Sequence, residues 1–364
     1  MIKEYLIRIK FILSKLITHF EHLPKKQKWI ASISSVFLIL MLILFIFWSI
    51  IGSSVGDGKQ KYQFSIEAGD GSIKVTRELK KLNLIKSPSY FHFLLYIHGN
   101  TKKIKQGIYS LDNGMNAKKI MDIIVSGKVA TVSVTIPEGY HNRQIADILL
   151  EKKFVSSKEE FLEVANSPEI IEKFKIPAKT TEGYLFPETY MFPLNYKPEK
   201  IVETMIERFF INLQQVEKAK NNTPDEIHQK VILASIIERE AKKDEDRPKM
   251  AGVFLKRLES KMPLESCATV QYLFDKPKKR LFKRDLETES PYNTYLHQGL
   301  PPGAISNPGL ASLKAAYNPE KSDYLFFLVK PDGFHHFSTS LEDHINAKRK
   351  YIDKKYKKKK SIAK

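Results

Sequence analysis

Hydrophobic residues are most concentrated near the start of the chain, where an uncharged run extends from Trp29 to Ile51. Its 23 residues match the roughly 20 that a helix needs to cross a bilayer. The only two tryptophans, Trp29 and Trp48, lie near its ends, as interfacial anchors do. A cleaved signal peptide would have a shorter apolar region followed by a small-residue cleavage site. We therefore expect a single N-terminal transmembrane helix at residues 29–51.

Charge is distributed unevenly around this helix. Residues 1–28 carry seven lysines and arginines against two acids, whereas the next basic residue after the apolar run is Lys59. Because positive charge is retained on the cytoplasmic side, residues 1–28 are expected to form a cytoplasmic basic segment. The linker at residues 52–62 and everything beyond it are then expected outside the cytoplasmic (inner) membrane.

Between residues 63 and 175 the same apolar pattern occurs twice, with an offset of 70 residues. Each copy has an alternating strand that ends near a glycine, an amphipathic helix, and a second helix that starts after a serine. The matching positions are Gly69 and Gly139, Leu79 and Leu149, Ser87 and Ser157, and Phe91 and Phe161. This βαα order resembles the LysM-type modules, which bind glycans that contain N-acetylglucosamine. We expect residues 63–175 to be a LysM-like α/β region that either binds glycan or acts as a spacer.

A strongly apolar helix is predicted from Thr223 to about Ala241. Thr223 can cap its start, and Pro224 suits its first turn. Near its end, Glu240 follows Leu233, Ile236 and Ile237 at helical spacing and therefore shares their apolar face. Desolvation and the negative end of the helix dipole both disfavour a carboxylate anion there. A raised pKa, and with it a general acid that works near neutral pH, is therefore expected at Glu240.

The alternative is that the charged end of this helix is a solvated, salt-bridging terminus, because runs of charge are usually surface features. Glu238 lies along the line of Val231, Ala234 and Ser235 rather than beside Glu240. We interpret Glu238 as structural and expect it to pair with Arg239 or Arg247.

Three turn-rich segments follow a different pattern from the helices. Residues 181–193 combine four aromatics with two acids, and residues 290–295 and 299–309 are rich in proline or glycine. Aromatic faces beside carboxylates are typical of sugar-binding clefts, where the rings stack on the C–H face of a sugar. The alternative is that the aromatics pack into the core. A hairpin is predicted later, with a strand at residues 324–329 that returns through Asp332-Gly333.

The charge and the motifs of the chain limit the kinds of partner and active site that it can have. Much of the formal net charge of +19 lies at the chain ends, and the tail from Lys348 has ten basic residues against one acid. The charge therefore predicts a solvated basic tail at residues 347–364 rather than a nucleic-acid partner. There is no phosphate loop, no H-E-x-x-H and no G-x-S-x-G, and the adjacent His335 and His336 point to opposite faces of a strand. No metal and no cofactor are expected, which leaves carboxylate chemistry.

Four separated blocks occur in a fixed order along the chain. They are Glu182-Gly183-x-x-x-Pro187-x-Thr189-Tyr190, Ala234-Ser235-Ile236-Ile237-Glu238-x-Glu240, Tyr292-Asn293-Thr294-Tyr295 and the loop from Gly299 to Gly309. In these residues the chain resembles the MltG (YceG-like) family of membrane-bound endolytic murein transglycosylases. One departure is that many members have Asp-Pro-Thr-Val where this chain has Cys267-Ala268-Thr269-Val270.

The resemblance implies an α+β protein with one N-terminal transmembrane helix, a LysM-like α/β subdomain and a mixed α+β catalytic domain at residues 176–346. It implies that Glu240 is catalytic and that the reaction cleaves the β-1,4 bond between N-acetylmuramic acid and N-acetylglucosamine, leaving 1,6-anhydro ends. The candidates for holding the glycan are Glu182, Tyr190, Asn293 and Tyr295, and the possible supporting residues are Glu238 and Ser235. The expected partners are peptidoglycan glycan strands, the membrane and peptidoglycan synthases.

Two other functions stay open at this point. A muramidase that uses water would need a second carboxylate facing Glu240, and Glu182 or Glu188 could supply it. A non-catalytic anchor protein would bind glycan through the LysM-like repeat alone.

Overall fold

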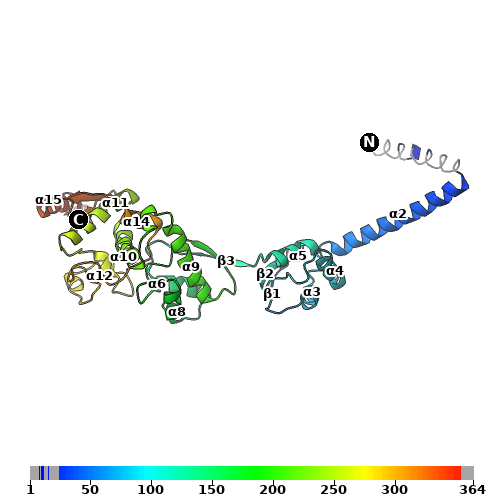
Figure 1. The fold of residues 1–364 in the computed structure, drawn as a ribbon, viewed down its shortest axis with the longest axis horizontal. Helices are drawn as coiled ribbons and strands as arrows, with labels where there is room; N and C mark the ends of the chain where they lie inside the picture. Colours follow the sequence, from blue (N-terminus) through cyan, green and yellow to red (C-terminus); the bar gives the residue numbers. More distant parts are fainter. Residues whose placement is uncertain (1–7, 9, 12–14, 16–23, 354–364) are drawn as a thin grey trace, which may run out of the picture. The chain divides into compact units, whose positions relative to one another are not determined.

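The computed structural model describes residues 8, 10, 11, 15 and 24–353. Most of the expected basic segment at residues 1–28, and the expected tail from residue 354 onward, lie outside the described residues. The chain divides into two compact units, Met1–Ala130 and Thr131–Lys364 (Figure 1). Both contain helices and strands, which confirms the expected α+β class.

The first unit begins with α2 (Lys25–Gly52), a helix of 28 residues that contains the predicted span. In the part of the chain that the structure describes, α2 is the one helix long and apolar enough to cross a membrane, judged by length and composition. None of its residues is buried against protein. An apolar helix without protein cover is consistent with a membrane anchor.

The rest of the first unit is a small α/β body. Its elements are β1 (Lys61–Ile66), α3 (Ser72–Lys81), α4 (Pro88–Ile97), β2 (Gly107–Asp112) and α5 (Ala117–Ser126). β1 and β2 are antiparallel, with Lys61 opposite Asp112. Phe64, Leu79, Phe91, Tyr109 and Ile120 lie in a core that this unit forms by itself.

The second unit opens with the second copy of the repeat. Its elements are β3 (Thr131–Thr135), α6 (Asn142–Glu151), α7 (Lys158–Ala165), α8 (Pro168–Lys173) and β4 (Thr189–Pro193). β3, α6 and α7 start 70 residues after β1, α3 and α4, which confirms the predicted repeat. Ser87 and Ser157 both cap the second helix of their copy through the side chain. Each copy is completed by an antiparallel strand, β2 or β4, and the second copy has the additional helix α8 before that strand. The two copies belong to different units.

The remaining elements of the second unit surround α10 (Pro224–Glu240), whose residues Val231–Ile237 are all buried. Thr223 and Glu226 form a capping box at its start, as the predicted helix start requires. α10 packs against α14 and α11. The other elements are α9 (Pro198–Leu213), η1 (Glu217–Ala219), η2 (Asp244–Asp246), α11 (Arg247–Glu259), α12 (Cys267–Gln271), α13 (Lys283–Leu286), α14 (Leu310–Tyr317), β5 (Phe326–Val329), β6 (His335–Ser338), α15 (Leu341–Lys348) and η3 (Arg349–Asp353).

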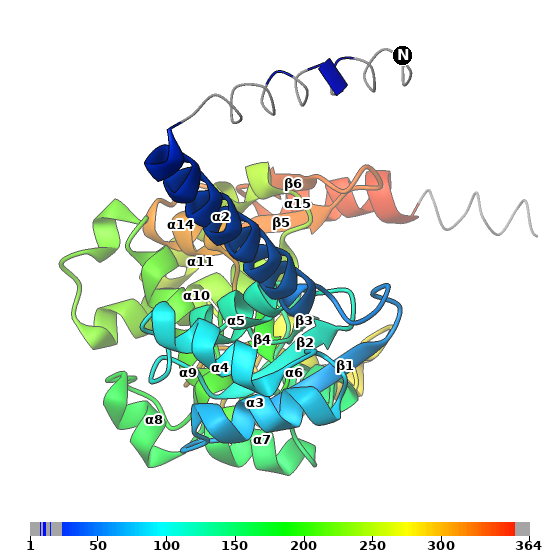
Figure 2. The same ribbon diagram turned by 90° about the vertical axis from the view of Figure 1, so that its right-hand side faces the viewer.

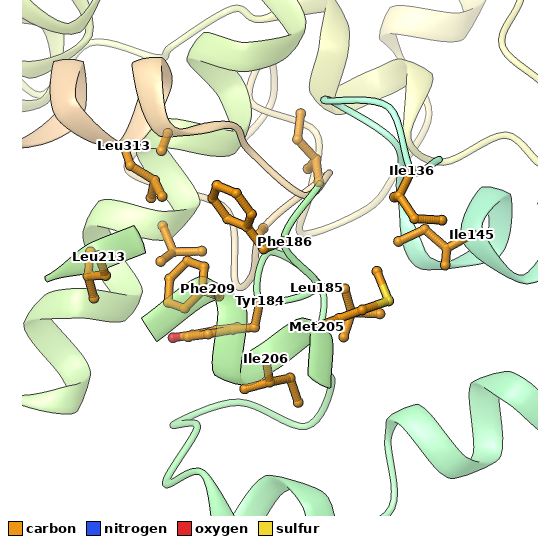
Figure 3. Close-up of a cluster of buried hydrophobic side chains, with 14 of the residues drawn as sticks. Ile136, Ile145, Tyr184, Leu185, Phe186, Met205, Ile206, Phe209, Leu213 and Leu313 are labelled. Atoms are coloured by element: carbon orange, nitrogen blue, oxygen red, sulfur yellow. The ribbon is translucent and has the colours of Figure 1, made fainter. Parts of the chain in front are cut away.

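The aromatic residues that follow Glu182 are part of the core of the second unit. Tyr184 and Phe186 lie beside Phe209 of α9, and Leu313 of α14 closes the same cluster (Figure 3). The predicted hairpin is present as β5 and β6, and α15 packs against both strands (Figure 2). For Tyr184 and Phe186, the alternative of packing into the core is therefore the correct one.

Candidate active site

Glu240 is the last residue of α10, and its two carboxylate oxygens have different surroundings. Oε1 accepts hydrogen bonds from the Ser266 hydroxyl at 2.6 Å and from the Ala268 amide at 3.2 Å. Oε2 has no hydrogen-bond partner among the described residues. Glu240 lines a cavity of about 500 Å³. One oxygen is therefore held by the protein while the other is left for a ligand.

Of the two donors to Glu240, Ala268 lies in the segment in which this chain departs from the common family sequence, and Ser266 directly precedes that segment. Ser266 is buried, and its own amide donates to the Thr294 hydroxyl at 3.1 Å. The Thr269 and Thr294 hydroxyls lie 2.9 Å apart. The segment around Ser266 and the 290–295 loop are thus fastened together directly beside the carboxylate. Ser266 and Ala268 were not predicted as site residues, although their place in or next to a loop of the resembling family was a usable signal.

Tyr295 is the one expected glycan contact that lines the cavity with Glu240. Its hydroxyl lies 3.0 Å from the Cys267 thiol, which lines the cavity as well. Burial raises the pKa of both Tyr295 and Cys267, so both side chains are neutral hydrogen-bonding groups at ordinary pH.

The same cavity contains a histidine that the sequence analysis placed only in the hairpin. His335 lines it with its Nδ1 2.9 Å from the Asp246 carboxylate, and Asp246 also accepts from the His335 amide. This pair fastens β6 to the start of α11.

Asn293 and Tyr190 lie away from the cavity. Asn293 has no exposed surface, donates to the Leu286 and Thr288 carbonyls, and accepts from the Tyr295 amide at 3.0 Å. Tyr190 lies on β4 and is 7% exposed, with its hydroxyl donating to the Phe186 carbonyl at 2.6 Å. In this structure both side chains hold loops rather than face a glycan.

Glu182 is buried within a polar network. Its carboxylate accepts from the Asn142 amide at 3.1 Å, the Asn307 side chain at 3.3 Å and the Tyr272 hydroxyl at 3.3 Å. Burial raises the pKa of Glu182 to about 8, although the Asn142 amide, the Tyr272 hydroxyl and Arg143 oppose the shift. Tyr272 directly follows α12, so Glu182 joins the 181–193 segment to the helix whose Ala268 binds Glu240.

Glu238 and Ser235 fix the 299–309 loop to α10. Glu238 pairs with Arg247 at 3.2 Å, which confirms the predicted partner, and both side chains are buried. The second Glu238 oxygen accepts from the Gly309 amide at 2.9 Å. Ser235 accepts from the Ile305 amide at 3.0 Å.

A second carboxylate facing Glu240 was the requirement for a water-using muramidase. Glu182 is bonded elsewhere, and Glu188 forms an ion pair with Arg208. Neither residue lines the cavity of Glu240, whose other lining carboxylate is Glu265. Glu265 pairs with Arg257 at 3.0 Å.

The matches to known proteins agree with this geometry. The model of the YceG-like family matches residues 64–350. The chain belongs to the YceG-like family. The match begins after α2 and includes both copies of the repeat, α10 and the loops that hold Glu240, which confirms the resemblance inferred from the four sequence blocks.

Two curated relatives and one solved YceG-like structure extend the comparison. The "Endolytic murein transglycosylase" of Bacillus subtilis (strain 168) is 34% identical over 319 residues, which cover 82% of this chain and 87% of the relative. The protein of the same name from Streptococcus pneumoniae (strain D39) is 30% identical over 324 residues, covering 79% of this chain and 58% of that longer protein. The crystal structure of a YceG-like protein from Listeria monocytogenes aligns with a TM-score of 0.55 at 34% identity, covering 79% of this chain and 99% of that one.

Proposed function

We propose that this YceG-like protein is a membrane-anchored endolytic lytic transglycosylase of peptidoglycan. The observation that carries the proposal is the geometry of Glu240, with one oxygen held by Ser266 and Ala268 and the other free in a cavity. The names of the relatives from B. subtilis and S. pneumoniae support the same activity. The substrate bond is the β-1,4 linkage from N-acetylmuramic acid to N-acetylglucosamine.

The proposed reaction needs one carboxyl group. Glu240 in its acid form donates a proton to the glycosidic oxygen as the bond from C1 of the muramoyl residue to that oxygen breaks. The 6-hydroxyl of the same muramoyl residue then bonds to C1, and its proton passes to the Glu240 carboxylate. The products are a 1,6-anhydromuramoyl end and a free N-acetylglucosamine 4-hydroxyl, and Glu240 regains its proton without the use of water.

This route differs from ordinary glycoside hydrolysis, in which a second carboxylate activates water or forms a glycosyl-enzyme intermediate. Glu265 is the other carboxylate on the cavity wall, and its side chain is engaged in an ion pair with Arg257. The placement of Glu182 and Glu188 outside this cavity favours the single-carboxylate route over the muramidase alternative.

The other site residues receive two different roles in this proposal. Tyr295 contacts the glycan from the cavity wall, while Glu182, Tyr190 and Asn293 position the loops around it. Glu238 and Ser235 support the site by holding the 299–309 loop on α10.

The anchor decides where the activity takes place. We propose that α2 crosses the cytoplasmic membrane with the N-terminus in the cytoplasm, which puts the small α/β body of the first unit and the whole second unit outside. An enzyme held there reaches nascent glycan strands, where cleavage would terminate their elongation beside peptidoglycan synthases.

The βααβ body of the first unit is proposed to bind glycan weakly. Its sedimentation with insoluble peptidoglycan, in the absence of α2, separates glycan binding from a spacer role.

Product analysis tests the proposed reaction. Purified full-length protein is incubated with peptidoglycan glycan strands, and the new ends are identified by mass spectrometry. We expect new anhydromuramoyl ends, produced by cleavage within long strands. Reducing muramoyl ends would identify a hydrolase, and the absence of new ends would leave the non-catalytic anchor as the better description.

A further inference from the structure

Helix α4 presents an apolar surface to the outside of the first unit. One side of this helix buries Phe91, Leu94 and Leu95 in the core. The outward side carries Phe93, Tyr96 and Ile97, with the half-buried Tyr90 at its edge, and we call these four residues the aromatic face of α4. Phe93, Tyr96 and Ile97 are 43%, 71% and 54% exposed. Since the outward side of a helix in a soluble body is normally polar, this face is expected to meet an apolar partner.

The aromatic face begins at the end of α2. The Trp48 ring lies 5.2 Å from that of Tyr90 and 4.9 Å from that of Phe93. The Lys86 ammonium, just before α4, donates to the Ile50 carbonyl at 3.0 Å and to the Ser53 hydroxyl at 2.7 Å. A cation at this position also complements the negative end of α2. Helix α4 is therefore fastened to the C-terminal end of α2 through both apolar and polar contacts.

These contacts fix the depth of α4 relative to a bilayer that α2 spans. Tryptophan at the end of a transmembrane helix lies in the interfacial layer, between the headgroups and the acyl chains. Tyr90 and Phe93 touch Trp48 and therefore lie at about the same level. Aromatic and aliphatic side chains on one face of a helix are the kind that bury in this layer.

We propose that the aromatic face of α4 lies in the outer interfacial layer of the membrane that α2 crosses, so that the first unit rests on the lipid surface. The partner is the lipid itself, because the exposed face is continuous with the helix that enters it. The inference rests on the membrane anchor of the proposed function, and it adds a second membrane contact beyond the anchor.

The first unit also supplies a matched control residue. Ile73 on α3 is 63% exposed, comparable with Ile97, and belongs to the same unit. Helix α4 packs against both α2 and α3, and Trp48 of α2 has its ring contacts with α4. Lipid contact should therefore be found at Ile97 and not at Ile73.

The experiment uses the full chain in nanodiscs made of equal parts phosphatidylglycerol and phosphatidylcholine. On a Cys267→Ser background, single nitroxide labels are attached at Tyr96→Cys, Ile97→Cys, Ile73→Cys and Leu40→Cys. Electron paramagnetic resonance then measures collisions with oxygen, which concentrates in lipid, and with a water-soluble nickel chelate. All four positions are exposed in the protein, so the labels leave the core intact.

The expected result is a ratio of oxygen to nickel collisions that is several-fold higher at positions 96 and 97 than at 73, with the highest ratio at 40. If the label at position 40 gives a lipid-like collision ratio while the ratios at positions 96 and 97 match that at position 73, the inference is overturned and the membrane anchor stands. A low, water-like collision ratio at position 40 would overturn both the lipid contact of α4 and the membrane anchor. Labels at 96 and 97 that are shielded from oxygen and nickel alike, with spin–spin broadening, would show that a second copy of the chain covers the face instead.

Discussion

Glu238 and Glu240 are two residues apart on α10, yet their carboxylates have opposite surroundings. Glu238 is buried against Arg247 at 3.2 Å, while Glu240 leaves one oxygen open to a cavity. The first carboxylate has its charge neutralised by a partner that the fold provides. The second is held in place by two donors, and its other oxygen is open for the proposed proton transfer, which leads to separate predictions for the two residues.

Replacing Glu240 should abolish cleavage without unfolding the protein. Glu240→Gln keeps the shape and removes the titrating proton, so release of anhydromuropeptides should fall by at least about 10²–10⁴-fold, the usual contribution of general acid–base catalysis. Glu245→Gln, on the exposed turn that follows α10, is the control and should retain full activity. Normal cleavage by Glu240→Gln would move the catalytic role elsewhere, and Glu265 would be the next residue to test.

Replacing Glu238 should affect stability first. Glu238→Gln leaves the buried Arg247 guanidinium without its main charge partner, and we expect a loss of roughly 3 kcal/mol in the free energy of unfolding. Asp244→Asn is the matched control, because Asp244 contacts the same arginine at 2.8 Å from a side chain that is 75% exposed. Its cost should be about 0–1 kcal/mol. Urea unfolding of both variants measures the difference, and equal costs would contradict the role of burial.

Ser266 should act on the rate through Glu240. Ser266→Ala removes a hydrogen bond to a carboxylate, a contact worth about 1.5–3 kcal/mol, so kcat should fall about 10-fold to 100-fold. KM should stay unchanged because Ser266 is buried and does not face the cavity. Ser266→Thr, which restores a hydroxyl, should recover part of the rate. A rise in KM with normal kcat would instead indicate a role in binding.

Glu182 should make the stability of the second unit depend on pH. Burial raises the pKa of Glu182 to about 8 from 4.5, so between these values the folded protein holds a proton that the unfolded chain has released. This contribution to the free energy of unfolding is complete below pH 4.5, the pKa of the group in the unfolded chain. It is lost as pH rises towards 8, by up to about 1.4 kcal/mol per pH unit. Glu182→Gln cannot ionise and should flatten this slope in unfolding measurements.

Glu188→Gln is the control for this slope. Its hydrogen bond with Arg208 lowers the pKa of Glu188, so this group titrates below the window in which Glu182 acts. The slope of Glu188→Gln should equal that of the natural protein. A Glu182→Gln variant with an unchanged slope would show that another group controls the pH dependence.

The orientation of the anchor is testable with a fusion. A reporter that matures only outside the cytoplasm, joined after Lys364, should be active because positive charge precedes α2 and keeps the N-terminus inside. The same fusion without residues 29–51 should be inactive. Activity of a cytoplasm-specific reporter at this position would reverse the topology.

The sequence by itself determined the elements and their repetition. The repeat of βαα units is visible because strand alternation, glycine turns and serine caps are local patterns, and they recur at the same 70-residue offset in the structure. The transmembrane candidate and the capped helix that ends at Glu240 follow from the same kind of local information. Family blocks then singled out Glu240 among many acids.

The tertiary structure decided what each polar side chain does. Asn293, Glu182 and Tyr295 have residue types suited to sugar binding, yet only Tyr295 lines the cavity with Glu240. The same donors and acceptors can hold a loop or a glycan, and sequence does not distinguish the two uses. Helical spacing put Glu240 on the apolar face and Glu238 apart from it, yet the Glu238 side chain is also buried, at 5% exposed, because Val231–Ile237 are buried on every side of α10.

The groups that surround Glu240 come from far along the chain. Ser266 and Ala268 are 26 and 28 residues away, and Glu182 is hydrogen-bonded to a residue 125 positions away. Such contacts exist only when loops are packed against one helix end, since no local pattern encodes them. Local periodicity placed the carboxylate at the end of α10, and long-range packing decided which of its oxygens is held and which is free to act.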